Sequence, residues 1–246
     1  MRNTFIPKIV LGVIGLATIA LWTFSLLVPS SQSTLPIETP GPSLSTKTPM
    51  PKVALWFGDS YVEGAGASKK SKTYSFRVSQ HFGLFHKNLS QGASGYIGNS
   101  EIAKKICGEV DCLAMIKVLE RQKMLRSDVI FVQAGLNDYA LTPENANVVK
   151  KFYRKLRATY PSSIVISISQ TKPFPEDDLQ KKIQYLAKKN VTEIGGYYVD
   201  IGEPLVGHPE WLSADGFHPN DLGYEVLANI VIKKTTPILE ALLSSK

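Results

Sequence analysis

The stretch Ala54–Gly66, ALWFGDSYVEGAG, decides the fold, because an apolar run leads directly into Gly-Asp-Ser and then into a second glycine cluster. The apolar run, from Val53 to Phe57, has the length and composition of a buried β-strand. Ser60 follows this strand at once, at the edge where open α/β sheets bind their ligands. Ser60 is therefore a candidate nucleophile, although Gly-Asp-Ser alone is also compatible with an ordinary turn.

Short apolar runs of the same kind alternate with longer helical patterns through the rest of the chain. The runs expected to form strands are Val53–Phe57, Phe85–Leu89, Val129–Ala134, Ser163–Ser169 and Tyr197–Asp200, of which the second is the weakest. Helices are expected to begin at Thr142 with Pro143 in the first turn, near Glu176, and near Asn220 or Asp221, the last being kinked or ended at Pro237. This alternation predicts an α/β fold with a parallel sheet of about five strands, covered by helices on both faces.

Residues 1–28 differ from the rest of the chain, since Arg2 and Lys8 precede an uncharged apolar segment that ends at Val28. A helix needs roughly 20 apolar residues to cross the hydrocarbon core, and a cleavable signal peptide has a shorter apolar segment. Because no Ala-x-Ala pattern follows, we favour an uncleaved signal-anchor over a cleaved signal peptide. Both interpretations place the rest of the chain outside the cytoplasm, anchored in the cell membrane with its N-terminus inside, or secreted.

Two further regions follow this segment. Residues 29–51 are dominated by Pro, Ser and Thr, which predicts an extended, flexible linker. Residues 52–246 are enough for one well-buried domain. With 43% hydrophobic and 20% charged residues, the chain of 246 residues has the composition of a soluble globular protein.

The formal net charge of +7 favours anionic surroundings such as a membrane surface or a cell-wall polymer. The lysine-rich stretches SKKSK and KKFYRKLR have the pattern of solvated loop and helix faces. We therefore expect no nucleic-acid partner.

The chain has two cysteines, Cys107 and Cys112. In an oxidising compartment they are expected to form one disulfide that closes a small loop, with two buried thiols as the alternative. Two cysteines without a nearby second pair of ligands cannot complete a tetrahedral metal site. The sequence suggests no metal ion and no other cofactor.

A serine nucleophile needs a base, and the best candidate among the four histidines is His218. Asp215 precedes it by three residues in ADGFHPND, a spacing at which a carboxylate can bind one ring nitrogen and leave the other for a serine. The alternative is a turn that caps the last helix, and this segment alone favours neither. His81, His86 and His208 have surroundings more typical of structural histidines.

The attack of a serine also needs donors for the oxyanion that forms. Asn137, in QAGLNDY, follows the third strand and can offer its side-chain amide. Gly92, Gly95 and Gly98, in NLSQGASGYIGN, follow the second strand and can bring a backbone N–H close to a substrate. Nucleophile, base, carboxylate and donors thus come from four loops at one edge of the expected sheet.

These residues make the chain resemble the GDSL/SGNH hydrolase family. The family's four blocks occur in order as FGDSY, GASGY, GLND and DGFHP, and the resemblance extends from Lys52 to the C-terminus. Two features depart from the pattern. Tyr61 stands where the family name has leucine, and Gly92 competes with Gly95 as the glycine of the second block.

The resemblance implies a flavodoxin-like three-layer α/β/α fold with a Ser-His-Asp triad. Ser60 would be the nucleophile, His218 the base and then the acid, and Asp215 the residue that orients it. The N–H groups of Ser60 and Gly95 and the amide of Asn137 would form the oxyanion hole.

The implied reaction is acyl transfer from a carboxylic ester through a covalent acyl-enzyme intermediate. No long apolar lid segment is visible, which favours small or carbohydrate-borne esters as substrates. Two alternatives remain at this point. One is an acyltransferase that uses the same residues with a sugar hydroxyl in place of water, and the other is a non-catalytic glycan-binding module on the same fold.

Overall fold

The computed structural model describes residues 50–98, 100–109, 112–122 and 125–244. The expected membrane segment, residues 1–28, and nearly all of the expected linker, residues 29–51, lie outside this range. Within the described range, no helix combines the length and the apolar character that a membrane crossing requires.

Five parallel strands form one sheet in the order β2-β1-β3-β4-β5. Their bounds are β1 Val53–Gly58, β2 Phe85–Asn88, β3 Val129–Gln133, β4 Ile164–Ile168 and β5 Tyr197–Val199. The central strands β1, β3 and β4 are almost wholly buried, whereas β2, at one edge, alternates exposed and half-buried residues. The expectation of a parallel sheet of about five strands is confirmed.

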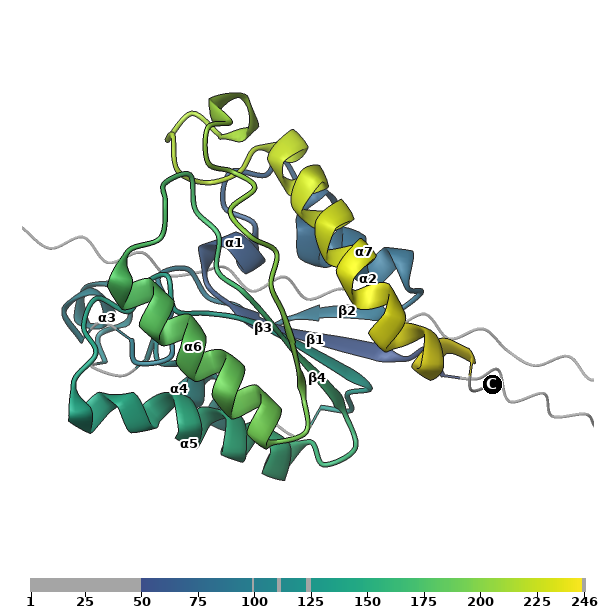
Figure 1. Cartoon of the computed structure of the whole chain (residues 1–246), viewed down its shortest axis with the longest axis horizontal. Helices are drawn as coiled ribbons and strands as arrows, with labels where there is room; N and C mark the ends of the chain where they lie inside the picture. The colour runs from purple at the N-terminus through teal and green to yellow at the C-terminus, as the bar shows by residue number, and fades with distance from the viewer. Residues whose placement is uncertain (1–49, 99, 110–111, 123–124, 245–246) are drawn as a thin grey trace, which may run out of the picture. The chain divides into compact units, whose positions relative to one another are not determined.

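Helices cover both faces of the sheet, which gives three layers (Figure 1). Their bounds are α1 Ser60–Glu63, α2 Tyr74–His81, α3 Ser100–Cys107, α4 Met115–Arg121, α5 Pro143–Thr159, α6 Asp178–Glu193 and α7 Asp221–Ser244, with short 3-10 helices at Lys70–Lys72 and Pro209–Trp211. Helices α2 and α7 pack together on one face, and α4, α5 and α6 lie side by side on the other (Figure 1). The sequence patterns predicted neither α3 nor α4.

Successive side chains of β1 point to opposite faces of the sheet, so the strand contributes to the hydrophobic core on both faces. Trp56 points to the face under α2 and α7, where its ring stacks on Phe131 at 4.1 Å between centroids. Its indole N–H donates to the Ser79 hydroxyl over 2.8 Å, so the buried polar atom is satisfied. Leu55 and Phe57 point to the opposite face and pack under α4, α5 and α6. A strand that is apolar on both sides is fixed between two helical layers.

The helix starts follow the local signals closely. The Thr142 hydroxyl accepts from the Asn145 backbone N–H, and the Asn145 side chain accepts from the Thr142 N–H, so the two residues form a capping box. Helix α7 begins at Asp221, as expected, but it does not end at Pro237. Leu239, beyond the proline, is fully buried, and burying it requires the helix to continue.

Candidate active site

Ser60 is the first residue of α1 and lies directly beyond the carboxyl end of β1. The preceding Asp59 caps this short helix, since its Oδ1 accepts a 3.0 Å hydrogen bond from the Tyr61 N–H. Gly58 is required for the sharp turn between strand and helix, because a Cβ there would lie 2.1 Å from a methyl carbon of Val62. The local sequence therefore places the hydroxyl of Ser60 at the ligand-binding edge of the sheet.

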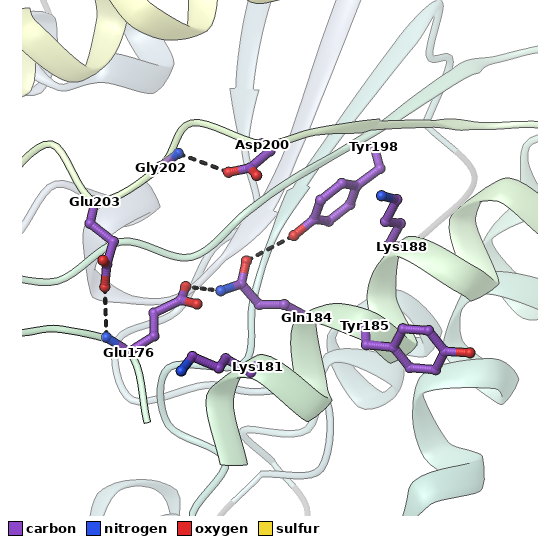
Figure 2. Close-up of a pocket in the computed structure, with 9 residues that line it drawn as sticks. All are labelled: Glu176, Lys181, Gln184, Tyr185, Lys188, Tyr198, Asp200, Gly202 and Glu203. Atoms are coloured by element: carbon purple, nitrogen blue, oxygen red, sulfur yellow. Dashed lines mark hydrogen bonds between the residues drawn. The ribbon is translucent and has the colours of Figure 1, made fainter. Parts of the chain in front are cut away.

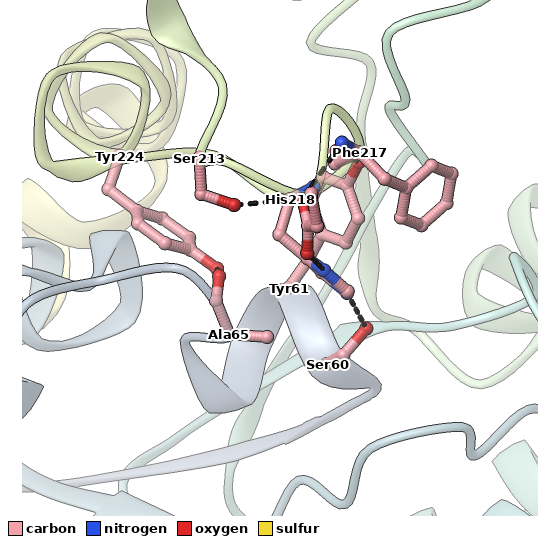
Figure 3. Close-up of polar contacts among 8 residues, drawn as sticks. Ser60, Tyr61, Ala65, Ser213, Phe217, His218 and Tyr224 are labelled. Atoms are coloured by element: carbon pink, nitrogen blue, oxygen red, sulfur yellow. Dashed lines mark hydrogen bonds and ion pairs between the residues drawn. The ribbon is translucent and has the colours of Figure 1, made fainter.

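The structure brings Ser60, His218 and Asp215 into one chain of hydrogen bonds. The Ser60 Oγ lies 2.9 Å from His218 Nε2, and His218 Nδ1 lies 2.6 Å from Asp215 Oδ2. Figure 3 shows the contact between the His218 ring and the Ser60 hydroxyl. With a proton on Nδ1, the ring donates to the carboxylate, and Nε2 accepts from the serine hydroxyl.

Asp215 also organises the loop that carries His218. Its Oδ1 accepts from the backbone N–H groups of Phe217 and His218, each over 2.9 Å, and from the Ser213 hydroxyl over 2.8 Å. The turn considered as the alternative interpretation is therefore present together with the bond to His218. The cap of α7 is a different residue, Asn220, whose Oδ1 accepts from the N–H groups of the first turn.

The hydrogen bond from His218, and then the bond from the Phe217 N–H, hold the pKa of Asp215 well below the usual value of an aspartate. The carboxylate is therefore charged at neutral pH. A charged carboxylate on Nδ1 stabilises a positive imidazolium ring.

Tyr61 connects the helix that carries Ser60 to the loop that carries His218. Its hydroxyl donates to the Phe217 carbonyl over 2.6 Å, and its ring centroid lies 5.5 Å from that of His218 (Figure 3). On the other side of α1, the Tyr224 hydroxyl donates to the Ala65 carbonyl over 2.8 Å. Tyr61 departs from the family pattern in the sequence, and no local signal indicates this contact.

Asn137 lies in the loop after β3, where its side-chain Nδ2 donates a 2.9 Å hydrogen bond to the Ser94 carbonyl. Ser94 belongs to the loop after β2, and its hydroxyl donates to the Gly58 carbonyl over 2.8 Å. The three loops that follow β1, β2 and β3 are thus joined. An amide nitrogen carries two hydrogens, so the bond to Ser94 leaves one for a ligand.

The N–H of Gly95 is engaged in this structure, because it donates to the Leu113 carbonyl over 3.1 Å, while the Gly95 carbonyl accepts from Met115. The expected part of Gly95 in an oxyanion hole stays a prediction that requires the Leu113 carbonyl to move away. The residue type has another explanation in the packing. A Cβ at position 95 would lie 2.3 Å from Asp138 Oδ1, so only glycine fits against this carboxylate.

The remaining histidines with described polar contacts have partners elsewhere. His86 Nε2 lies 3.3 Å from the Ser75 hydroxyl, and His208 Nδ1 lies 2.9 Å from a carboxylate oxygen of Glu210. Among the described residues, no group of three or more His, Cys, Asp or Glu side chains could hold a metal ion. Cys112 is buried. The side chain of Cys107 lies outside the described residues, so the pairing of the two cysteines stays a prediction.

Two pockets lie beyond the carboxyl ends of β4 and β5. One, of about 430 Å³, is lined mainly by apolar side chains, among them Pro173 and Phe174 after β4 and Leu205, Pro209 and Leu212 before His218. The other, also of about 430 Å³, is polar and lies between α6 and β5. Figure 2 shows that Gln184 at its centre is held by Tyr198 and Glu176. Of these two pockets, the apolar one borders the loop of the candidate triad, through Ser213 and Gly216.

The sequence matches the family model of the GDSL-like lipase/acylhydrolases over residues 56–226. The chain belongs to this family. The matched residues include Ser60, Gly95, Asn137, Asp215 and His218. No curated protein sequence matched this GDSL-like chain.

Solved structures with the same fold include several carbohydrate esterases. An acetyl xylan esterase from Butyrivibrio proteoclasticus is 14% identical, with a TM-score of 0.58 over 77% of this chain and 64% of the other. A family two carbohydrate esterase from Clostridium thermocellum, solved with cellohexaose, is also 14% identical, with a TM-score of 0.60 over 78% and 66%. The salicylyl-acyltransferase SsfX3 is 20% identical, with a TM-score of 0.59 over 78% and 56%. This GDSL-like chain spans less than two thirds of each of these proteins.

Proposed function

We propose that this protein is an extracytoplasmic serine esterase that cleaves carboxylic acyl esters through an acyl-enzyme intermediate. The observation that carries the proposal is the chain of hydrogen bonds from Ser60 through His218 to Asp215, with spacings of 2.9 and 2.6 Å. A nucleophile, a base in contact with it and a carboxylate that orients the base are the parts that acyl transfer requires. Membership of a family of lipases and acylhydrolases supports the same reaction.

In the proposed reaction, His218 Nε2 accepts the proton of the Ser60 hydroxyl while its oxygen attacks the ester carbonyl. Asp215 holds the tautomer in which Nε2 is free to accept, and it stabilises the imidazolium that forms. The imidazolium then gives its proton to the departing alcohol. In the second half, His218 activates a water molecule that releases the acid from Ser60 and restores the free hydroxyl.

The oxyanion of each tetrahedral intermediate would be bound by the backbone N–H of Ser60 and by the free amide hydrogen of Asn137. Gly95 would add its N–H once the Leu113 carbonyl has moved from its present 3.1 Å contact. Each donor of this kind contributes about 10²- to 10³-fold to kcat in enzymes where one has been removed.

The proposed substrates are small or carbohydrate-borne acyl esters. One solved neighbour is named an acetyl xylan esterase, and another is named a family two carbohydrate esterase in complex with cellohexaose, which supports an acylated carbohydrate as substrate. Phe174 is 56% exposed on the loop after β4, beside the apolar pocket that borders the triad loop. An exposed aromatic ring at the ligand-binding edge can pack against a sugar ring or an apolar group.

The cellular setting is part of the same proposal. Residues 1–28 would hold the enzyme in the cell membrane or direct its secretion, and the linker 29–51 would let the catalytic domain reach its substrate. The proposed partners are the ester substrate and, through the N-terminal segment, the membrane.

An acyltransferase with the same residues is the second candidate, favoured by the likeness in fold to a salicylyl-acyltransferase. Only the acceptor would differ, a hydroxyl compound in place of water. Adding a sugar acceptor to the assay would then divert the acyl group from water to the sugar. A glycan-binding module fits less well, because binding does not require the contact between Ser60 and His218.

The test is ester turnover by the full chain in detergent, with p-nitrophenyl acetate and acetylated sugars as substrates. Wild-type enzyme should release acetate, and Ser60→Ala should reduce kcat to background. Ser71→Ala, which changes an exposed serine outside the site, is the matched control and should keep full activity. Equal activity of the wild type and Ser60→Ala would contradict the proposal.

A further inference from the structure

Asp138, the residue after Asn137, is a buried carboxylate that three consecutive backbone N–H groups surround. Its Oδ2 accepts from the Tyr96 N–H over 2.9 Å. Its Oδ1 accepts from the N–H groups of Ile97 over 2.9 Å and Gly98 over 3.2 Å. Only 3% of Asp138 is exposed. Successive N–H groups that converge on one point form a concave site for an anion, and here the anion is a side chain of the same protein.

Burial raises the pKa of Asp138, and the bonds from the three N–H groups act in the opposite direction by favouring the charged form. The neutral amide of asparagine would have the same shape but only one accepting oxygen. At either position its NH₂ group would face at least one backbone N–H, so donor would meet donor. The site is therefore built for a carboxylate and not only for a side chain of this size.

The loop that Asp138 holds also carries the groups that set the geometry around Ser60. The carbonyl of Ser94 accepts the Asn137 amide, and the hydroxyl of Ser94 reaches the carbonyl of Gly58, two residues before Ser60. Position 95 lies so close to the Asp138 carboxylate that it has room only for glycine. Asp138 thus holds residues 96–98 of the loop, while Ser94 of the same loop binds the Asn137 amide and the Gly58 carbonyl.

We propose that Asp138 is a positioning residue for the oxyanion-binding groups: its three backbone contacts to residues 96–98 hold the loop after β2, and through Ser94 they aim the amide of Asn137 at the reacting carbonyl. Asp138 itself touches neither the substrate nor Ser60. This inference rests on the proposed esterase function.

The test is Asp138→Asn in the full chain, with kcat and KM measured on p-nitrophenyl acetate. We expect kcat to fall about 10- to 100-fold, which is less than or at the lower end of the loss caused by removing an oxyanion donor, because the donor is displaced and not removed, with KM almost unchanged. Asp128→Asn is the matched control. Asp128 is also an aspartate that accepts a backbone N–H, that of Val53 over 2.8 Å, but it lies at the amino ends of the strands, away from Ser60. This control should keep the wild-type kcat.

A double-mutant cycle separates positioning from a general loss of stability. In the background of Asn137→Ala, the amide to be aimed is gone, so adding Asp138→Asn should reduce kcat by less than about threefold. Asp138→Ser, which leaves room for a water molecule, is the second variant in case Asp138→Asn does not fold, and the same result is expected.

The outcomes distinguish this inference from the proposed function. Wild-type kcat in folded Asp138→Asn or Asp138→Ser, or a loss that is fully additive with Asn137→Ala, would overturn the role of Asp138 alone. A wild-type enzyme that turns over no ester would overturn the proposed function and this inference with it.

Discussion

The Tyr61 hydroxyl donates a 2.6 Å hydrogen bond to the Phe217 carbonyl, across 156 residues of sequence, and so joins the helix of Ser60 to the loop of His218. The nucleophile and its base come from distant parts of the chain, and their 2.9 Å contact depends on how these two segments are held. Tyr61 is 1% exposed, so its hydroxyl has no water to bond in place of the carbonyl.

Tyr61→Phe removes this bond and leaves the ring in place. We expect the free energy of unfolding to fall by about 1 kcal/mol, the usual net contribution of such a bond, and kcat to fall as the Ser60 to His218 contact loosens. Thermal unfolding and ester turnover measure the two effects. Tyr224→Phe is the control, because it breaks a similar bond to Ala65 away from His218. It should lower stability by a similar amount with a smaller loss of kcat, and equal losses would contradict the role of Tyr61.

Asp215→Asn should reduce kcat by about 10⁴-fold near neutral pH, as the corresponding change does in other Ser-His-Asp enzymes. An asparagine amide facing Nδ1 favours the tautomer with its proton on Nε2, which can no longer accept from Ser60. The pKa of Asp215 is lowered, so its contribution to stability is present above pH 4 and is lost only as the pH falls below the usual aspartate range. Thermal unfolding between pH 5 and 9 should therefore show no step from Asp215 in the wild type. A kcat within threefold of wild type would rule out this role.

Asp59 should make the free energy of unfolding depend on pH with the opposite sign. Burial raises its pKa to about 7, and its Oδ2 has no hydrogen-bond partner among the described residues. Between about pH 4 and pH 7 the folded state keeps a proton that the unfolded state has lost, so the free energy of unfolding falls as the pH rises through this window. Each unit of pKa difference corresponds to about 1.4 kcal/mol.

Asp59→Asn should remove this slope, because an amide oxygen still accepts from the Tyr61 N–H and carries no charge to bury. Urea unfolding at pH 5 and pH 8 measures it as the difference between the variant and the wild type, in which the other titrating groups cancel. The variant should gain stability relative to the wild type on going from pH 5 to pH 8. Asp178→Asn, at an exposed site, should show no such gain. An equal slope in Asp59→Asn and wild type would show that Asp59 is not the source.

Phe174→Ala tests the apolar pocket beside the triad loop. If the ring packs against the substrate, its loss should raise KM about tenfold, equivalent to about 1.4 kcal/mol of binding, with kcat little changed. Kinetics on acetylated sugars and on p-nitrophenyl esters of increasing chain length would show which part of the substrate meets the ring. Phe85→Ala is the control, since Phe85 is 58% exposed at the start of β2, away from the site. If both variants had the KM of the wild type, Phe174 would not contact the substrate.

The sequence predicted what depends on short-range pattern. The apolar run before Ser60 and the similar run before Asn137 indicated buried parallel strands. Because the carboxyl ends of parallel strands lie at the same edge of the sheet, both residues were expected at that edge. The three-residue spacing of Asp215 and His218 allowed a hydrogen bond between them without deciding it against a helix-capping turn, and the structure has both the bond and the turn. These features are local, so a single sequence contains them.

The contacts that the sequence did not reveal are long-range. Neither the bond from Tyr61 to Phe217 nor the bond from Gly95 to Leu113 has a local signal, because each joins segments whose approach is set only by the packing of the whole domain. The three N–H groups around Asp138 likewise come from another loop. The sequence left open whether the last helix ends at Pro237 or continues past it, and the burial of Leu239 accompanies its continuation.

The central claim is that Ser60 is a nucleophile activated by His218, and active-site labelling tests it most directly. The full chain would be treated with a fluorophosphonate, digested, and mapped by mass spectrometry, beside His218→Ala and Ser60→Ala. We expect one adduct on the peptide with Ser60, strongly slowed labelling in His218→Ala and none in Ser60→Ala. An unlabelled Ser60 in folded wild-type protein, or labelling that is as fast without His218, would contradict it.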